Sequence, residues 1–244
     1  MSSELERTNP QLARSLMNLA IAQNMLGRAA EALPNIERAV EIRRILARDN
    51  PDGNLVFLAR SLTELSSCLV NDTRPDEAIG PGQESVDIRR RLAETNPERH
   101  IGDLARSLHQ TATAHHDAGN SSQALACYEE AISTRRDLVT RHPSNDAQTA
   151  LAESLACLAA LQLTVQHPAA ALPLAQEAAR LIEWRTDAQP ENLRPVAKQL
   201  TTVLISVANV LDANEHTHEA QALRREIAAL QNSDTGTETA GGTD

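Results

Sequence analysis

The segment Leu12-Ala13-Arg14-Ser15-Leu16 recurs along the chain as Leu58-Ala59-Arg60-Ser61-Leu62 and as Leu104-Ala105-Arg106-Ser107-Leu108. Weaker copies follow at Leu151-Ala152-Glu153-Ser154-Leu155 and Leu200-Thr201-Thr202-Val203-Leu204, so successive copies begin 46, 46, 47 and 49 residues apart. A second marker keeps nearly the same spacing, at Asn50-Pro51, Asn96-Pro97, His142-Pro143 and Gln189-Pro190. Self-similarity at such a period indicates an array built from one supersecondary unit.

Each unit is predicted to contain two helices. In the first unit the apolar residues recur at the spacing of one helix face, from Leu12 through Leu16 to Leu19. Gly27 then favours the end of this helix, because glycine adopts the left-handed conformation common just after a helix. A second helix is expected from about Ala29 to Arg48, and Asn50-Pro51 should end it, since the residue before proline is pushed out of the helical region. The unit is therefore a helical hairpin.

One hairpin cannot bury its apolar faces alone, so the hairpins are expected to stack side by side with a continuous core. This predicts an all-α protein, an α-solenoid of about five helix-turn-helix repeats. The expected repeats span about 12–57, 58–103, 104–150, 151–199 and 200–231. Residues 1–11 are interpreted as the remnant of a preceding repeat or a linker, and residues 232–244, rich in Ser, Thr, Gly, Asp and Glu, as a disordered tail.

Composition excludes several classes of function. The formal net charge is −10, which opposes nucleic-acid binding because that binding depends on cationic contacts to phosphates. No apolar stretch approaches the length of a membrane helix, and the charged N-terminus lacks the apolar run of a secretion signal. The three cysteines are far apart and contain no CxxC pair, which favours a reducing cytoplasm over a disulfide framework or a zinc site.

The hairpins resemble tetratricopeptide repeats (TPRs) of the long-period form found in kinesin light chain and many bacterial proteins. The residues that carry the resemblance are Asn18-Leu19-Ala20, Gly27, Ala32 and Ala39 in the first unit and Ala112, Gly119, Ala124, Tyr128 and Ala131 in the third. An early proline in the second helix (Glu31-Ala32-Leu33-Pro34) is similar to the kinesin light chain form. The resemblance implies a right-handed superhelix whose first helices line a concave, partner-binding groove.

Carried over by position, the resemblance places candidate groove residues on three first helices. They are Arg14, Met17, Asn18 and Ile21 in the first unit, Arg60 and Glu64 in the second, and Arg106, His109, Gln110 and His116 in the third. The arginine repeated at one position of each unit would form a ladder that suits carboxylates, because a guanidinium pairs with them bidentately. The expected partner is a protein or peptide with acidic residues or a C-terminal carboxylate. Two alternatives stay open: the arginines pair with acidic neighbours, and Met17 with Ile21 and Met25 belongs to the core.

No motif of a catalytic, phosphate-binding or dinucleotide-binding site occurs, and no enzyme activity or cofactor is expected. His109 and His116 are seven residues apart on one helix face, but a metal site needs three or four converging ligands. The leading hypothesis is a non-catalytic scaffold or adaptor that binds a protein or peptide in its groove. The alternatives are a regulatory sensor for a small signal or peptide, and a remnant of a larger signalling protein.

Two local features favour specific departures from a regular array. Gly80-Pro81-Gly82 falls where the second helix of unit two should continue, so a kink or break is expected there. It is either a hinge or a decayed repeat. The first unit lacks a clear polar cap, and this suggests self-association through its uncovered helix.

Overall fold

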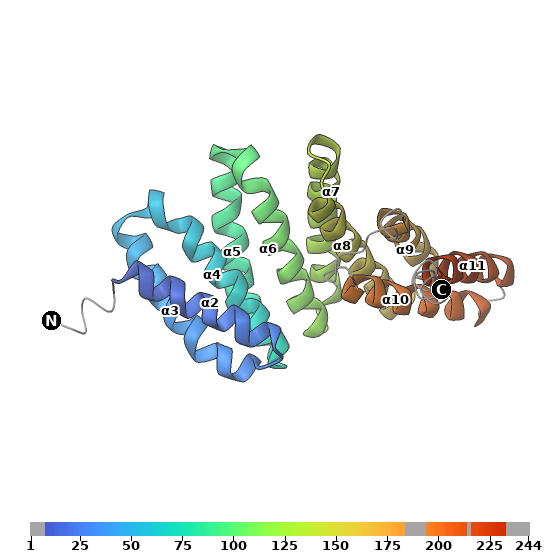
Figure 1. Ribbon diagram of the computed structural model, residues 1–244, viewed down its shortest axis with the longest axis horizontal. Helices are drawn as coiled ribbons and strands as arrows, with labels where there is room; N and C mark the ends of the chain where they lie inside the picture. Colours follow the sequence, from blue (N-terminus) through green and yellow to red (C-terminus); the bar gives the residue numbers. More distant parts are fainter. Residues whose placement is uncertain (1–7, 184–193, 214–215, 233–244) are drawn as a thin grey trace, which may run out of the picture. The chain divides into compact units, whose positions relative to one another are not determined.

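The computed structural model describes residues 8–183, 194–213 and 216–232, and these residues form ten α-helices and no strand (Figure 1). The all-α prediction is therefore confirmed. The helices are α2 (Pro10–Met25), α3 (Ala29–Asp49), α4 (Pro51–Asn71), α5 (Pro75–Thr95), α6 (Pro97–Asp117), α7 (Ser121–Arg141), α8 (Asn145–Thr164), α9 (Pro168–Glu183), α10 (Arg194–Ala213) and α11 (Thr217–Asn232).

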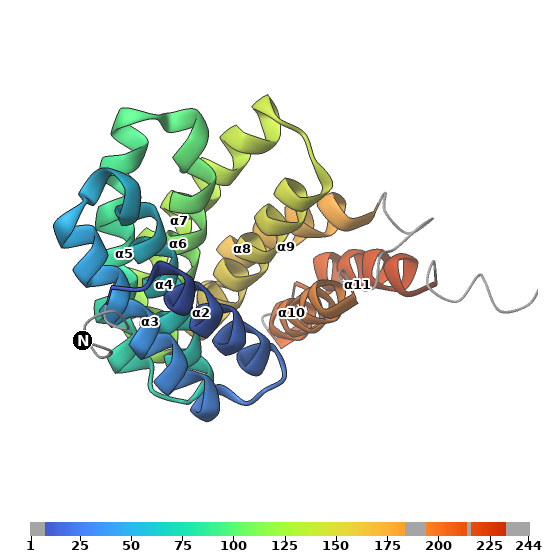
Figure 2. The ribbon, with the colours of Figure 1, turned by 60° about the vertical axis from the view of Figure 1, so that its left-hand side comes forward.

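The chain divides into two compact units, residues 1–134 and 135–244. In the first unit, consecutive helices from α2 to α6 pack against each other, and the first helices α2, α4 and α6 also contact one another in order. In the second unit α8 packs on α9 and α10 on α11, while α10 also contacts α8 and α9. This pattern of stacked hairpins, which both ribbon views show within each unit (Figures 1 and 2), is that of a TPR-like α-solenoid.

The last leucine of the repeated segment is a main core residue of the later hairpins. Leu62, Leu108, Leu155 and Leu204 are completely buried, and the corresponding Leu16 is half-buried. Around them the cores of both units consist largely of alanine, which lets neighbouring helices approach closely. Leu62, Leu108, Leu155 and Leu204 thus each fill a space closed by neighbouring helices, whereas Leu16 stays partly exposed.

The turn inside each hairpin uses the left-handed backbone conformation. Gly27 and Gly119 have φ angles of 73° and 78° in the first and third hairpins, as the glycine signal predicts. Thr73 and Gln166 hold the same position in the second and fourth hairpins, with φ angles of 60° and 63°. The turn therefore keeps its conformation where another residue replaces glycine. For the β-branched Thr73 this left-handed conformation is strained.

The Asn-Pro marker joins two helices with almost no loop. Asn50 is the C-cap of α3 and directly precedes Pro51, the first residue of α4. Asn96 has the same role between α5 and Pro97. Proline suits both tasks, because it disfavours helix in the residue before it and fits the first helical position. The expected repeat starts, at residues 12, 58, 104, 151 and 200, fall inside first helices, and the repeat boundaries stay a prediction.

The paired arginines near the end of each second helix connect neighbouring hairpins. The second arginine of each pair reaches the next second helix: Arg44 pairs with Glu84, Arg90 with Glu130 at 2.6 Å and Arg136 with Glu177 at 2.5 Å. The first arginine is buried instead. Arg89 pairs with Asp103 of α6, and Arg135 donates to the carbonyl of Ala150 and to Ser154 Oγ in α8. The motif thus links a hairpin to both helices of its successor.

The expected break at Gly80-Pro81-Gly82 is wrong, because α5 runs without interruption from Pro75 to Thr95. Two other second helices also continue through an interior proline, Pro34 in α3 and Pro173 in α9. A Cβ atom at Gly82 would lie 2.8 Å from Thr111 Oγ1 of α6 and 3.2 Å from Ser66 Oγ of α4. The bare backbone of α5 at Gly82 therefore packs tightly against α4 and α6.

Three parts of the predicted organisation lie outside the described residues. They are residues 1–7 of the expected N-terminal remnant, residues 233–244 of the expected tail, and the Gln189-Pro190 marker. Residues 10 and 11 of the expected remnant belong to α2, whose N-cap Asn9 accepts hydrogen bonds from the backbone of Gln11 and Leu12.

Candidate partner-binding site

A cavity of about 530 Å³ opens between the start of α2, the end of α3 and the first half of α4. Four of the predicted groove residues line it, namely Arg14, Met17, Asn18 and Arg60. Arg14, Asn18 and Arg60 are exposed, whereas Met17 is only 5% exposed and accepts a long hydrogen bond from Ser61 Oγ at its sulfur. Met17 therefore belongs to both the core and the cavity wall. The remaining lining residues are Pro10, Gln11, Arg43, Asn54 and Phe57.

Arg43 and Phe57 are the functional candidates that the groove prediction missed. Arg43 comes from the second helix α3, yet its guanidinium reaches the first helices, where Nη2 donates to the carbonyl of Pro10 at 3.1 Å. Its guanidinium carbon also lies 4.8 Å from the centroid of the Phe57 ring. The repeated arginine pairs in the sequence could have pointed to Arg43, but the single phenylalanine of the chain gave no signal of its position.

The cavity is cationic in a protein whose net charge is −10. Three guanidinium groups line it, from Arg14, Arg43 and Arg60, and none of the lining residues is acidic. Arg43 is only 5% exposed, and burial lowers the pKa of its guanidinium, because a low-dielectric site disfavours charge. Such a set of donors is chemically suited to an anionic group with two oxygen atoms, above all a carboxylate.

Glu64 of α4 and Arg106 of α6 belong to a second cluster of charged side chains, with Arg60 of α4 and Arg89 of α5. Burial raises the pKa of the Glu64 carboxyl, and the nearby guanidinium groups of Arg60, Arg106 and Arg89 oppose that increase. Arg89, which is 2% exposed, is held 2.8 Å from Asp103 Oδ2. Arg60 therefore belongs to both the cavity and this cluster, whereas Arg106 does not line the cavity. The sequence left open that the repeated arginines interact with acidic neighbours, and for Arg60 and Arg106 the nearby Glu64 supports this alternative.

The other predicted groove residues do not line the cavity. Ile21 is half-buried further along α2. The His109 ring meets the Tyr128 ring edge-on, with centroids 5.6 Å apart, while Gln110 and His116 are half-buried on α6. Among the described residues no group of three or more His, Cys, Asp and Glu side chains could hold a metal ion. Within the same residues, no helix is both long and apolar enough to span a bilayer.

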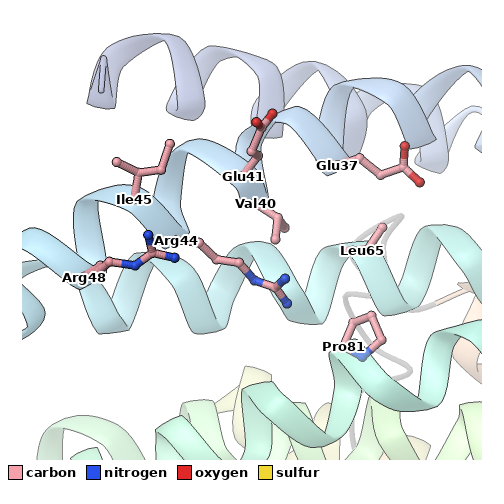
Figure 3. Close-up of a pocket in the computed structure, with 8 residues that line it drawn as sticks. All are labelled: Glu37, Val40, Glu41, Arg44, Ile45, Arg48, Leu65 and Pro81. Atoms are coloured by element: carbon pink, nitrogen blue, oxygen red, sulfur yellow. The ribbon is translucent and has the colours of Figure 1, made fainter. Parts of the chain in front are cut away.

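A second cavity, of about 510 Å³, lies between α3 and α5, with Leu65 of α4 and Pro81 in its floor (Figure 3). Val40 and Ile45 add apolar surface, and four charged side chains surround it: Glu37, Glu41, Arg44 and Arg48. Figure 3 shows Glu41 and Glu37 along α3, with the Arg44 side chain reaching toward α5. Two of the charged side chains have partners within the chain, because Glu41 pairs with Arg38 and Arg44 with Glu84. Fewer charged side chains are therefore available to a ligand in this cavity than in the arginine-lined cavity.

Comparison with known proteins identifies the repeat. Residues 12–52 and 104–144 match the model of a tetratricopeptide repeat family. A solved structure from Podosopora anserina, described as a kinesin light chain with nearly identical TPR-like repeats, is 20% identical, with a TM-score of 0.65 over 94% of this chain and 99% of that chain. BtubC (BKLC) from P. vanneervenii is 15% identical, with a TM-score of 0.57 over 100% and 96% of the two chains.

A third structure, the assembly chaperone of RpL4 (Acl4), is 18% identical, with a TM-score of 0.52 over 95% of this chain and 79% of that chain. A comparison with curated protein sequences gives no match. The two matched segments are tetratricopeptide repeats, and the chain has the fold of kinesin light chain-like TPR proteins. The resemblance found in the sequence is confirmed.

Proposed function

We propose that this protein is a non-catalytic scaffold that holds a protein partner by a carboxylate-bearing segment in the cavity between α2 and α4. Repeat proteins of this kind present extended surfaces for protein partners, and Acl4, which shares the fold, is named as an assembly chaperone of another protein. The carboxylate is either an acidic side chain or the C-terminus of the partner. The expected place of action stays the cytoplasm.

The observation that carries the proposal is the buried Arg43 beside a cavity without acidic residues. The equivalent arginine of the next hairpin, Arg89, has Asp103 as its partner. At the corresponding place the first hairpin has Phe57, so its arginine lies over an aromatic ring and no ion pair with a described carboxylate forms. A buried cation without a counter-ion is costly, and a carboxylate supplied by a partner would remove that cost.

The size of the cavity favours a short segment rather than a whole domain surface. About 530 Å³ accommodates a few residues, and its walls combine the three arginines with apolar surface from Phe57, Met17 and Pro10. Asn18 and Asn54 add donors and acceptors for a peptide backbone. The sensor alternative depended on a hinge at Gly80-Pro81-Gly82, and the uninterrupted α5 leaves it without that support.

The test uses three fluorescein-labelled peptides. The third has the sequence Gly-Ser-Ala-Gln-Leu and ends in a carboxamide, so it carries no carboxylate. The first two share the sequence Gly-Ser-Ala-Glu-Leu. One ends in a free carboxylate and the other in a carboxamide. Fluorescence anisotropy should show at least about tenfold tighter binding of a peptide with a carboxylate than of the carboxamide-glutamine peptide, since one charge-assisted pair contributes about 1.5–3 kcal/mol. Equal binding of all peptides would overturn the proposal.

The variant Arg14→Gln with Arg60→Gln should abolish that preference. Arg91→Gln is the matched control, because Arg91 is exposed on α5 and does not line the cavity. A pull-down with mass spectrometry, run with the wild type, the double variant and the control, then identifies the natural partner as the protein lost only with the double variant.

A further inference from the structure

Arg60 of α4 belongs to two charged environments at once. Its side chain lines the arginine-lined cavity between α2 and α4, together with Arg14 and Asn18. It also lies near the carboxyl of Glu64, which follows it by four residues on the same helix. Side chains four residues apart lie on one face of a helix, with Cβ atoms about 5–6 Å apart, so the two groups can reach each other. An anionic ligand in the cavity and the Glu64 carboxylate therefore attract the same guanidinium group.

Glu64 occupies the place in the second hairpin that Asn18 occupies in the first, because the two hairpins repeat after 46 residues. Asn18 is exposed and neutral, and it lines the cavity. Glu64 is half-buried and brings a carboxylate to the same position of the next first helix. Since both residues fit this position of the repeat, the fold itself does not require the carboxylate.

The buried arginine of the second hairpin has a carboxylate of its own. Arg89 is 2% exposed, and its Nη1 lies 2.8 Å from Asp103 Oδ2. Arg89 is also near Glu64, but Asp103 already supplies it with an opposite charge. The other cations near Glu64 are the exposed guanidinium groups of Arg60 on α4 and Arg106 on α6. Of these two arginines, only Arg60 lines the cavity.

The half-buried position of Glu64 favours pairing with a cation. Burial removes part of the water around a carboxylate, and an opposite charge nearby offsets that loss. Within the part of the chain that the structure describes, no ion pair fixes Arg60 or Arg106 in one place. Both are long side chains with many rotamers, so each can turn toward Glu64 or away from it.

From these observations we infer that Glu64 competes with the partner's carboxylate for Arg60, and that Arg106 limits this competition by attracting Glu64 toward α6. The inference rests on the proposed function, because it concerns the same cavity. It makes Glu64 a residue that sets the affinity of the site through Arg60. Arg106 is then a positioning residue that acts on the cavity through Glu64, although it does not line the cavity.

The test measures binding of the labelled peptide Gly-Ser-Ala-Glu-Leu with a free carboxylate end to the full chain, by fluorescence anisotropy. Glu64→Gln should bind this peptide about two- to fivefold more tightly than the wild type, the factor that corresponds to one partly exposed ion pair. Arg106→Gln should weaken binding by a similar factor, because Glu64 then pairs with Arg60 alone. Circular dichroism checks that both variants keep their helicity.

Two double variants separate competition from the general effect of removing a charge. In the Arg60→Gln background, Glu64→Gln should leave the affinity unchanged, because the cation for which the two carboxylates compete is absent. Arg14 and Arg43 still line the cavity there and keep binding measurable. In the Glu64→Gln background, Arg106→Gln should also have no effect. A long-range field would act on the ligand in both backgrounds.

Three results would overturn the inference and leave the proposed function intact. They are wild-type affinity in Glu64→Gln, an equal gain from Glu64→Gln when Arg60 is replaced, and a loss from Arg106→Gln that persists when Glu64 is replaced. Failure of the proposed function is recognised from the wild type alone, which would then bind peptides with and without a carboxylate equally. That result would overturn both proposals.

Discussion

Arg43 lies over the ring of Phe57, at the place in the repeat where Arg89 meets the carboxylate of Asp103. Both arginines are almost completely buried, at 5% and 2% exposure. The difference between the two hairpins is thus one acidic side chain, and it decides whether the guanidinium is neutralised within the chain or faces an open, cationic cavity.

Phe57→Asp should convert the first hairpin into a copy of the second. The new carboxylate is expected to pair with Arg43 and to lower the affinity for the carboxylate-bearing peptide at least about tenfold, the equivalent of one charge-assisted hydrogen bond. Anisotropy with the labelled peptides measures the change. Phe57→Leu, which removes the ring and adds no charge, should keep the preference for the carboxylate. Wild-type affinity in Phe57→Asp would show that Arg43 does not contribute to binding.

Asp103→Ala should destabilise the protein by about 3 kcal/mol, because it leaves the Arg89 charge buried without its partner. Urea unfolding followed by circular dichroism gives the change in the free energy of unfolding. Glu94→Ala serves as the control, since Glu94 is exposed on α5 and should change stability by less than about 0.5 kcal/mol. Equal effects of the two substitutions would mean that the ion pair is not important for stability.

Gly82→Ala and Gly80→Ala should have opposite effects although both lie in α5. An added Cβ at Gly82 would lie 2.8 Å from Thr111 Oγ1 and 3.2 Å from Ser66 Oγ, so these side chains or their helices must shift, at a cost of about 1–3 kcal/mol. Nothing lies within 4 Å of a Cβ at Gly80, where alanine should stabilise the helix by roughly 0.5–1 kcal/mol. Thermal unfolding compares them. A stabilising Gly82→Ala would contradict the close approach of α5 to α4 and α6.

Thr73→Gly should stabilise the second hairpin by roughly 0.5–1 kcal/mol, since glycine adopts the φ of 60° without the strain of a β-branched residue. The reverse substitution, Gly119→Thr, should destabilise the third hairpin by a similar amount. Its φ is 78°, and no neighbour lies within 4 Å of an added Cβ, so the effect isolates the backbone. Urea unfolding of both variants checks the prediction, and a destabilising Thr73→Gly would contradict it.

Glu64→Gln should stabilise the protein at neutral pH and have little effect in acid. Burial raises the pKa of the Glu64 carboxyl above its ordinary value of 4.5, so the folded state binds this proton more tightly than the unfolded state. The stability associated with Glu64 is therefore full below the unfolded pKa and decreases as pH rises through the folded pKa. Melting temperatures of the wild type and the variant at pH 4 and pH 7 measure it. A lower melting temperature of Glu64→Gln at pH 7 would mean that the attraction of Arg60 and Arg106 exceeds the burial cost.

Much of the fold was predictable from the sequence because each of its causes is local. The glycine at Gly27, the Asn50-Pro51 junction and the recurring leucines each act within one turn or one helix face. The break at Pro81 was predicted from the same local rules and is wrong. Gly82 also packs closely against Ser66 of α4 and Thr111 of α6, about 16 and 29 positions away, and such contacts lie outside the reach of local rules.

The candidate site was predictable only in part. The resemblance to TPR proteins selected Arg14, Met17, Asn18 and Arg60 by their positions on the first helices, and the structure brings these four to one cavity. Arg43 and Phe57 belong to different helices, and Arg106 lies outside the cavity although it repeats the same sequence position. A periodic pattern gives the face on which a side chain lies, but the distance between residues on different helices depends on how these helices pack.

The sequence by itself determined that the chain is a stack of helical hairpins, since a near-identical segment every 46–49 residues leaves each hairpin with an apolar face that only its neighbour can cover. Only the tertiary structure decided which arginines are neutralised and which remain available. That outcome depends on whether a carboxylate lies within a few ångströms of a buried guanidinium, because electrostatic interaction energies depend on distance and burial rather than on sequence spacing.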